Sequence, residues 1–246
     1  FAYYVRETLR PALERFGLKK KDGEAQAVSL LRPQLMAWLG KEGQSEDVRR
    51  YADSLAKSYL ADPESIDPAL AGVALSVAAI AGDRQDFEAY KTHFEKAQVP
   101  AERQHYLAAL GNFADVELRE AALNYAIEGP IRANELFTIT GGMFSTTVGH
   151  DRVFRWLTEN YEAITSRLPR EFVALMPLFA GGCSQARLEA ARTFFAQPEH
   201  KVDGTDNYLA KVTDQVTDCV NLRQREGAAV AAYLNRLMSA RTDVPY

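Results

Sequence analysis

The sequence has no excess of positive charge and no long apolar run. It carries 29 basic and 33 acidic side chains in 246 residues, which gives a formal net charge of −4. The only dense basic run, residues 19–21, is interpreted as a solvated loop. A nucleic-acid binder needs clustered lysine and arginine to displace counterions from phosphate, and a membrane-spanning helix needs roughly 20 consecutive apolar residues. The sequence therefore predicts no nucleic-acid partner and no membrane segment.

Cysteine is scarce, since the chain contains only Cys183 and Cys219. Two cysteines are too few for a disulfide scaffold, and these two do not form a C-x-x-C pair. Cys183 follows a double glycine, where a thiol at a helix N-terminus could be reactive, but no histidine or arginine is obviously paired with it, so a reactive thiol is the disfavoured interpretation. Cys219 lies on an apolar helical stripe and is interpreted as a small buried hydrophobe. The cysteine content leaves the cellular compartment unknown.

The usual signatures of a catalytic site are missing. Four histidines are present, and none has the H-E-x-x-H spacing that places two zinc-binding imidazoles on one helical face. His105 and His150 are therefore interpreted as surface or capping residues. The glycine pairs at 141–142 and 181–182 fit no phosphate-binding motif and are interpreted as helix-ending turns. Asp214 and Asp218 are interpreted as a solvated helix face. The sequence predicts no metal site and no catalytic residue in this chain.

The chain also lacks an initiator methionine and opens on the apolar segment 1–5. Glu7 and Arg10 follow at once and no small-residue cleavage site is present, so the segment does not fit a signal peptide. We expect the chain to be one domain, residues 1–246, of a longer polypeptide.

Helical patterns dominate what is present. Glycine and proline divide the sequence into intervals of roughly 10 to 20 residues, which suit helices better than strands. Between Ser45 and Leu60 the apolar residues follow helical spacing, with Ser45 as the expected N-cap. The same spacing recurs along 118–125 and 209–220. These intervals predict an all-α chain of twelve or thirteen helices.

The predicted helices group into pairs. The first helix of each pair is expected to begin near residues 25, 67, 100, 131, 169 and 206. Such intervals are typical of helix-pair arrays, in which each pair buries its apolar face against its neighbours. We expect an α-solenoid of HEAT-like antiparallel pairs in a curved, bowl-like array, and an irregular helical bundle is the alternative.

Short segments in a shared order point to a family. They are residues 30–35 (LLRPQL), 107–110 (LAAL), 131–135 (IRANE), Gly149 and 154–161 (FRWLTENY), followed by matching residues between 187 and 234. In this order the chain resembles the C-terminal helical domain of the zinc aminopeptidases related to aminopeptidase N and the endoplasmic reticulum aminopeptidases. It departs from the family at three places. Residues 69–71 are Ala-Leu-Ala where the family has Asn-Leu-Arg, so a family arginine is lost. Asn134-Glu135 replaces Gln-Asp, and residues 160–161 are Asn-Tyr in place of Asn-Trp.

The resemblance implies a specific role. In that family an upstream catalytic domain carries zinc and H-E-x-x-H, and the C-terminal helices cover its cleft and limit which peptides enter. It implies that this chain is non-catalytic, that its partners are its own upstream catalytic domain and peptide substrates, and that zinc belongs to the catalytic domain. The alternative function is a stand-alone α-solenoid that binds a protein partner on its concave face.

Four residues in family-matched positions are the expected substrate-facing set: Arg32, Arg132, Asn134 and Glu135. An arginine on a concave wall can hold a peptide carboxylate by two charged hydrogen bonds. In the alternative interpretation Arg32 and Arg132 hold adjacent helices together by binding a helix C-terminus or a neighbouring acid.

Overall fold

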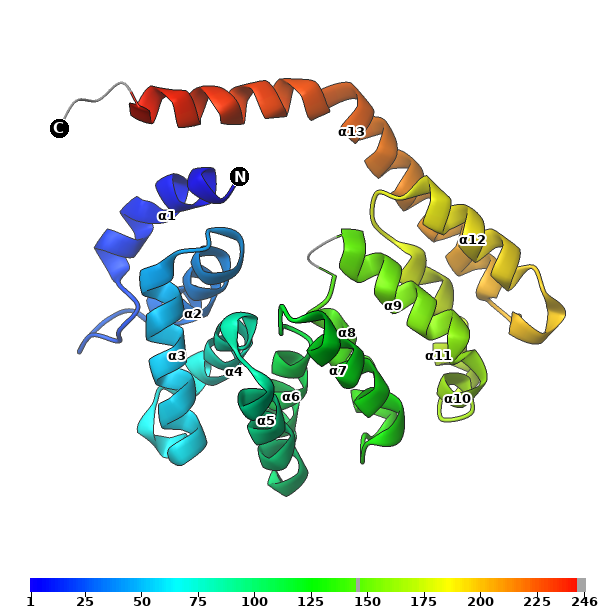
Figure 1. Cartoon of the computed structure of the whole chain (residues 1–246), viewed down its shortest axis with the longest axis horizontal. Coiled ribbons are helices and arrows are strands. Elements are labelled where there is room, and N and C mark those ends of the chain that lie inside the picture. The colour runs from blue at the N-terminus through cyan, green and yellow to red at the C-terminus, as the bar shows by residue number, and fades with distance from the viewer. Residues whose placement is uncertain (145–146, 243–246) are drawn as a thin grey trace. The chain divides into compact units, whose positions relative to one another are not determined.

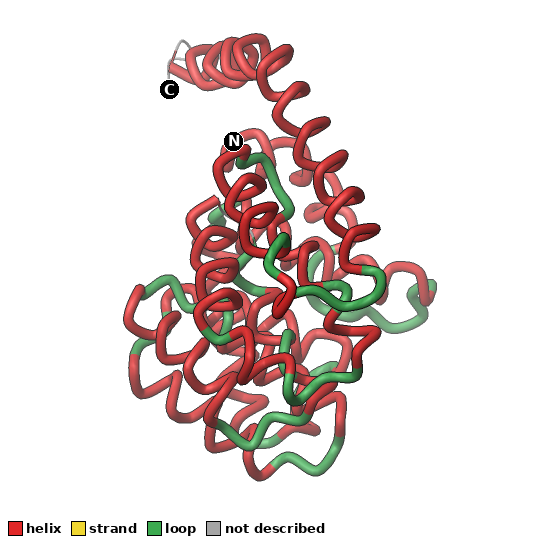
Figure 2. The backbone as a smooth tube through the Cα atoms, turned by 90° about the vertical axis from the view of Figure 1, so that its right-hand side faces the viewer, coloured by secondary structure: helices red, strands yellow, loops and turns green. Residues whose placement is uncertain are grey.

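The computed structural model describes residues 1–144 and 147–242, and within them every regular element is a helix (Figures 1 and 2). The α-helices of the described residues are α1 (Ala2–Phe16), α2 (Gln26–Ala37), α3 (Glu46–Ala61), α4 (Pro68–Ala78), α5 (Arg84–Lys96), α6 (Pro100–Leu110), α7 (Val116–Glu128), α8 (Thr138–Gly141), α9 (Thr147–Glu159), α10 (Tyr161–Thr165), α11 (Arg170–Val173), α12 (Gln185–Phe195) and α13 (Thr205–Thr242). The predicted all-α fold is confirmed. The HEAT-like solenoid stays a prediction.

Local capping explains several of the helix starts. The Asp67 carboxylate accepts a hydrogen bond from the Ala69 amide at 3.0 Å, and Pro68 takes the first position of α4. Asp83 and Asp86 form a reciprocal capping box at the start of α5. Side-chain acceptors and an N-terminal proline satisfy or remove amides that have no partner within the helix. These signals act within four residues, so they are readable from the sequence.

Two local expectations were wrong. Ser45 occupies the N-cap position of α3, but its side chain makes no capping hydrogen bond. The helix expected to begin near Ile131 is a short 3₁₀ helix, η4 (Ala133–Glu135), followed by the four-residue α8.

The chain divides into two compact units. Unit 1 comprises residues 1–122 with the end of α13 from Leu234, and unit 2 comprises residues 123–233. The prediction of one domain over residues 1–246 stays a prediction, and each unit is described by itself below.

The core of unit 1 is built around α4, which packs on α2, α3 and α6. α4 is apolar on nearly all sides, and a helix of that kind is stable only when neighbours surround it. The buried side chains at the α2–α3–α4 contact are Met36, Leu39, Val48, Ala52, Leu70, Ala74 and Val77.

Gly40 allows the closest approach in this core. It lies in a turn of π-helix, Trp38–Glu42, that follows α2. A Cβ atom at Gly40 would stand 2.6 Å from Val77 Cγ1 and 3.1 Å from Val77 Cγ2. Carbon atoms cannot approach so closely, so only glycine fits opposite Val77.

We expect Gly40→Ala to lower the free energy of unfolding by about 1–3 kcal/mol, the usual cost of overpacking a filled core. The measurement is urea denaturation of the two single variants and of the pair Gly40→Ala, Val77→Ala. Removing the Val77 methyl groups makes room for the new methyl, so the pair should cost less than the sum of the singles. Additive costs would show that the Val77 contact is not the cause.

Unit 2 has an aromatic core. The Trp156 indole Nε1 donates to the Leu123 carbonyl at 3.1 Å, and the Tyr161 hydroxyl donates to the His200 carbonyl at 2.9 Å. Phe154, Trp156, Tyr161 and Phe195 are buried. Buried indole and phenol groups need such partners.

The interpretation of Cys219 as a small buried hydrophobe was wrong, and the pairing of the two cysteines was not predicted. Cys183 and Cys219 form a disulfide with a Cα–Cα distance of 5.2 Å, which is well within the range that a disulfide spans. Both residues are half-buried in unit 2. Cys183 is therefore not a reactive thiol, and Cys219 is not an isolated hydrophobe. Periodicity places Cys219 on a helix face but cannot identify a partner 36 residues away.

Surface expectations mostly hold. Residues 19–21, Asp214 and Asp218 are exposed. The expectation for His105 and His150 was wrong, because both are half-buried and pack against other side chains: His105 contacts Tyr59 edge-on, and the His150 ring lies 4.8 Å from the Phe144 ring. Burial lowers the pKa of both imidazoles. Among the described residues no helix combines the length and apolarity needed to cross a bilayer.

Candidate functional site

Three of the four predicted site residues lie on one short loop of unit 2. The loop follows α7, and Glu135 closes it: the Glu135 carboxylate accepts a hydrogen bond from the Arg132 amide at 3.0 Å, and the Glu135 amide donates to the Arg132 carbonyl at 2.9 Å. Glu135 is only 3% exposed. The Glu135 side chain thus caps η4 and stabilises the backbone of the loop.

Arg167, which the sequence did not single out, holds the other side of the loop. Its guanidinium donates to the carbonyls of Ala126 at 3.2 Å, Ile127 at 3.1 Å and Ile131. The last carbonyls of a helix lack partners within the helix and attract cations. Gly129-Pro130 predicts that α7 ends there and leaves carbonyls that need a donor. Nothing in the sequence identifies Arg167, about 40 residues later, as that donor.

The two remaining residues of the loop face solvent. The Arg132 side chain is 55% exposed, and its guanidinium approaches Glu135 only to 4.0 Å. Asn134 is also exposed, and the described residues contain no hydrogen-bond partner for its side chain. Both side chains can therefore bind a ligand without breaking an existing close contact.

An apolar pocket of about 230 Å³ opens beside this loop. Its wall combines η4 with the segment around α11, and its lining residues are Ala133, Asn134, Phe137, Leu168, Pro169 and Phe172. Phe172 is 53% exposed, so part of the apolar lining is open to solvent. Asn134 is the one polar side chain in the lining. A pocket with apolar walls and one amide in its lining suits an apolar side chain next to a peptide group.

Arg32 has a different environment, in unit 1. It is 1% exposed, and its guanidinium forms a two-pronged ion pair with both Glu24 oxygens and donates to the Phe16 carbonyl at 3.3 Å. Arg32 lowers the pKa of the Glu24 carboxyl to about 2, and Glu24 in turn raises the pKa of Arg32. This geometry matches the interpretation of Arg32 as a residue that joins adjacent segments, because no donor faces solvent.

A second pocket, of about 240 Å³, lies in unit 1 between α3, α4 and α5. It has a charged rim, in which Lys57 pairs with Asp53 at 2.8 Å and Arg50 pairs with Asp47. None of the predicted site residues lines it. Lys57 and Arg50 already have acidic partners. They are therefore less suited than the exposed Arg132 to bind an anionic ligand.

The described residues contain no cluster of three or more histidine, cysteine, aspartate or glutamate side chains able to hold a metal ion. The described residues therefore offer no set of ligands for zinc, which the resemblance assigns to the catalytic domain.

Comparison with known proteins decides the family. Residues 1–218 match the family described as the ERAP1-like C-terminal domain, which is most of the chain. The chain belongs to the ERAP1-like C-terminal domain family. The predicted resemblance to the C-terminal domain of aminopeptidases is thereby confirmed.

The curated relatives of this ERAP1-like domain are yeast aminopeptidases. It is 25% identical over 197 residues to "Aminopeptidase 2, mitochondrial" of Saccharomyces cerevisiae, an alignment that covers 76% of this chain and 20% of the relative. It is 26% identical over 193 residues to "Alanine/arginine aminopeptidase" of the same yeast (77% and 22%), and 21% identical over 236 residues to "Aminopeptidase 2" of Candida albicans (94% and 25%). The chain thus spans about a fifth to a quarter of the length of these relatives.

Proposed function

We propose that this chain is the non-catalytic C-terminal domain of a zinc-dependent aminopeptidase, in which it covers the active-site cleft and selects peptide substrates. The observation that carries the proposal is the family match over residues 1–218. The relatives named as aminopeptidases are four to five times longer than the aligned part, which leaves room in them for a catalytic domain. In this proposal zinc and the peptide-bond chemistry belong to that other domain.

The substrate-facing part of the chain would be the loop with Arg132 and Asn134. The apolar pocket takes an apolar side chain of the peptide, the Asn134 amide binds a peptide group, and the Arg132 guanidinium binds a carboxylate by two charged hydrogen bonds. Glu135 and Arg167 hold the loop in shape. Arg32 stabilises unit 1 and has no direct contact with the peptide.

We expect Arg132→Ala, made in the full-length enzyme, to lower kcat/KM about threefold to tenfold for peptides with a free C-terminal carboxylate. The same peptides with an amidated C-terminus should be cleaved at nearly the wild-type rate, because they offer no carboxylate to the guanidinium. The measurement is kcat/KM over a series of peptides of increasing length, each in both C-terminal forms.

Arg155→Ala is the matched control, because Arg155 is also an exposed arginine of unit 2 but lies on α9, outside the loop that carries Arg132. It should leave both peptide series unchanged. If Arg132→Ala lowers thermal stability without changing the ratio between free and amidated peptides, the arginine is structural and the substrate-facing role is lost.

The non-catalytic role has its own test. The isolated chain with added zinc is expected not to hydrolyse an aminoacyl chromogenic substrate. Turnover above background that persists on repurification, and is abolished by a chelator, would place a catalytic site in this chain and overturn the proposal.

A further inference from the structure

The disulfide lies where α13 leaves the core of unit 2. Val212 and Val216 of this helix are fully buried, and Cys219 comes three residues, nearly one turn, later. From residue 221 to residue 226 every side chain is exposed. The bond therefore joins α13 to the rest of unit 2 at the last turn that buries apolar side chains, just before the helix becomes solvated.

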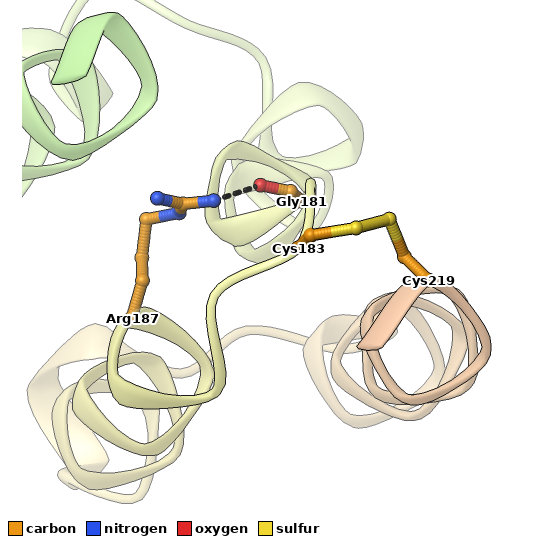
Figure 3. The surroundings of a disulfide bond; sticks show 4 residues. All are labelled: Gly181, Cys183, Arg187 and Cys219. Atoms are coloured by element: carbon orange, nitrogen blue, oxygen red, sulfur yellow. Dashed lines mark hydrogen bonds between the residues drawn. A yellow bond between two sulfur atoms is a disulfide. The ribbon is translucent and has the colours of Figure 1, made fainter. Parts of the chain in front are cut away.

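The other half of the bond lies in the turn before α12, where Arg187 binds the Gly181 carbonyl (Figure 3). Arg187 donates to the carbonyls of Ala180 at 3.2 Å and Gly181 at 2.5 Å, and the Ser184 hydroxyl caps α12. Gly182 has φ +98, a backbone conformation that other residues rarely adopt. Cys183 thus lies between Gly181, whose carbonyl binds Arg187, and Ser184, which caps α12. The disulfide therefore ties α13 to a hydrogen-bonded turn.

A hydrogen bond also joins α13 to α12, but it lies before the disulfide along α13. α12 and α13 run side by side in unit 2 (Figure 1), where the Arg192 guanidinium donates to the Thr213 hydroxyl at 3.4 Å, nearly two turns before Cys219. A solvated helical segment, such as residues 221–226, opens at lower cost than a buried one. A covalent bond at the edge of the buried part opposes that opening.

We propose that the Cys183–Cys219 disulfide persists in the protein in its natural cells, where it clamps residues 220–230 of α13 to the rest of unit 2, and that the protein therefore folds in an oxidising compartment. Disulfides form and persist in such compartments and are rare where thiols are kept reduced. The inference goes beyond the proposed function, because it stands on the geometry of unit 2 whatever the parent enzyme does.

The chemistry is a thiol–disulfide exchange. The two thiols lose two protons and two electrons and form one S–S bond. The oxidant is an external disulfide, either a small molecule such as glutathione disulfide or the disulfide form of an oxidoreductase, and it is released as two thiols. A dithiol reductant or a phosphine reverses the step.

The first test counts thiols in the protein from its natural cells. Cells are lysed in denaturant with an alkylating reagent, and the mass of peptides that contain Cys183 and Cys219 is measured. We expect no alkylation without reductant and one alkyl group on each cysteine after reduction. Alkylation of both cysteines without reductant would overturn the proposal.

The second test is hydrogen exchange of the folded chain before and after reduction with a phosphine. Peptides from residues 217–230 are expected to exchange about tenfold faster once the bond is broken, while α9 and α12 keep their protection. Unchanged exchange at 217–230 would contradict the clamp. An equal rise in α9 and α12 would contradict its local character.

The matched control is the double variant Cys183→Ser, Cys219→Ser. It should show the exchange rates of the reduced protein and no response to phosphine, since these are the only cysteines in the chain. If this variant does not fold, wild-type protein reduced after folding gives the same comparison.

Discussion

Arg187→Met is expected to lower the free energy of unfolding by about 3 kcal/mol, one of the largest effects of any single replacement in unit 2. Arg187 is 4% exposed and joins three groups: the Asp151 carboxylate and the carbonyls of Ala180 and Gly181. Methionine fills a similar volume but donates nothing, so two carbonyls that Arg187 satisfies lose their donor. Each buried group left unsatisfied costs about 1–3 kcal/mol.

Two further variants separate the charge of Arg187 from its geometry. Asp151 is 47% exposed, so Asp151→Asn should cost less than about 1 kcal/mol, as for other solvent-exposed pairs. The cost of Arg187→Lys should lie between those of Asp151→Asn and Arg187→Met, because one ammonium can reach Asp151 but cannot also bind both carbonyls.

The readout for all three is urea denaturation followed by Trp156 fluorescence. Trp156 is 5% exposed and is one of two tryptophans in the chain. The other, Trp38, belongs to unit 1 and can be replaced by phenylalanine in every variant, since it is half-exposed. A cost for Asp151→Asn as large as that for Arg187→Met would show that the ion pair, not the two carbonyls, holds this turn.

Helix positions were predictable because their causes are local. α2, α4 and α6 begin within one residue of their predicted starts. Asp67, Pro68 and Pro100 act on amides within the next turn, and a proline or an acidic cap has the same effect in most contexts. The apolar spacing of α3 is likewise a property of the segment itself, and its buried residues include Val48, Ala52 and Tyr59.

The failures share a different cause, which is contact between distant residues. The segment after Ile131 was expected to be a full helix, but Arg167 and Glu135 hold its backbone in a turn. Cys183 and Cys219 were interpreted separately although they are bonded. In each case the local pattern was compatible with two structures, and a partner more than 30 residues away decided between them.

The candidate site was predicted only as a set of positions. Family-matched positions identified Arg132 and Asn134 but not the pocket beside them, since Leu168 and Phe172 come from a distant segment and carry no motif. Arg32 was identified without Glu24, because charged residues eight apart across a loop follow no helical spacing. The substrate-facing role of Arg132 and Asn134 stays a prediction.

Arg32→Met is expected to lower the melting temperature at neutral pH by roughly 5–10 °C. The Glu24 carboxylate binds Arg32, the Ser29 hydroxyl at 3.0 Å and the Lys21 amide at 3.2 Å, so the pair fastens the loop between α1 and α2. Replacing Arg32 leaves the Glu24 carboxylate, whose side chain is only 9% exposed, without the arginine that neutralises its charge. Arg50→Met is the control: its ion pair with Asp47 is largely solvated, so the melting temperature should move by no more than about 2 °C.

The same pair predicts a pH dependence of stability. Arg32 lowers the pKa of Glu24 from 4.5 to about 2. A carboxyl whose pKa is lower in the folded state adds stability that is complete above the unfolded pKa and is lost as pH falls toward the folded pKa. The stability difference between wild type and Glu24→Gln should therefore be constant above pH 4.5 and shrink steadily between pH 4.5 and pH 2. Melting curves by circular dichroism at half-unit pH steps measure it, and a difference that stays constant down to pH 2 would show that Glu24 is not held ionised by Arg32.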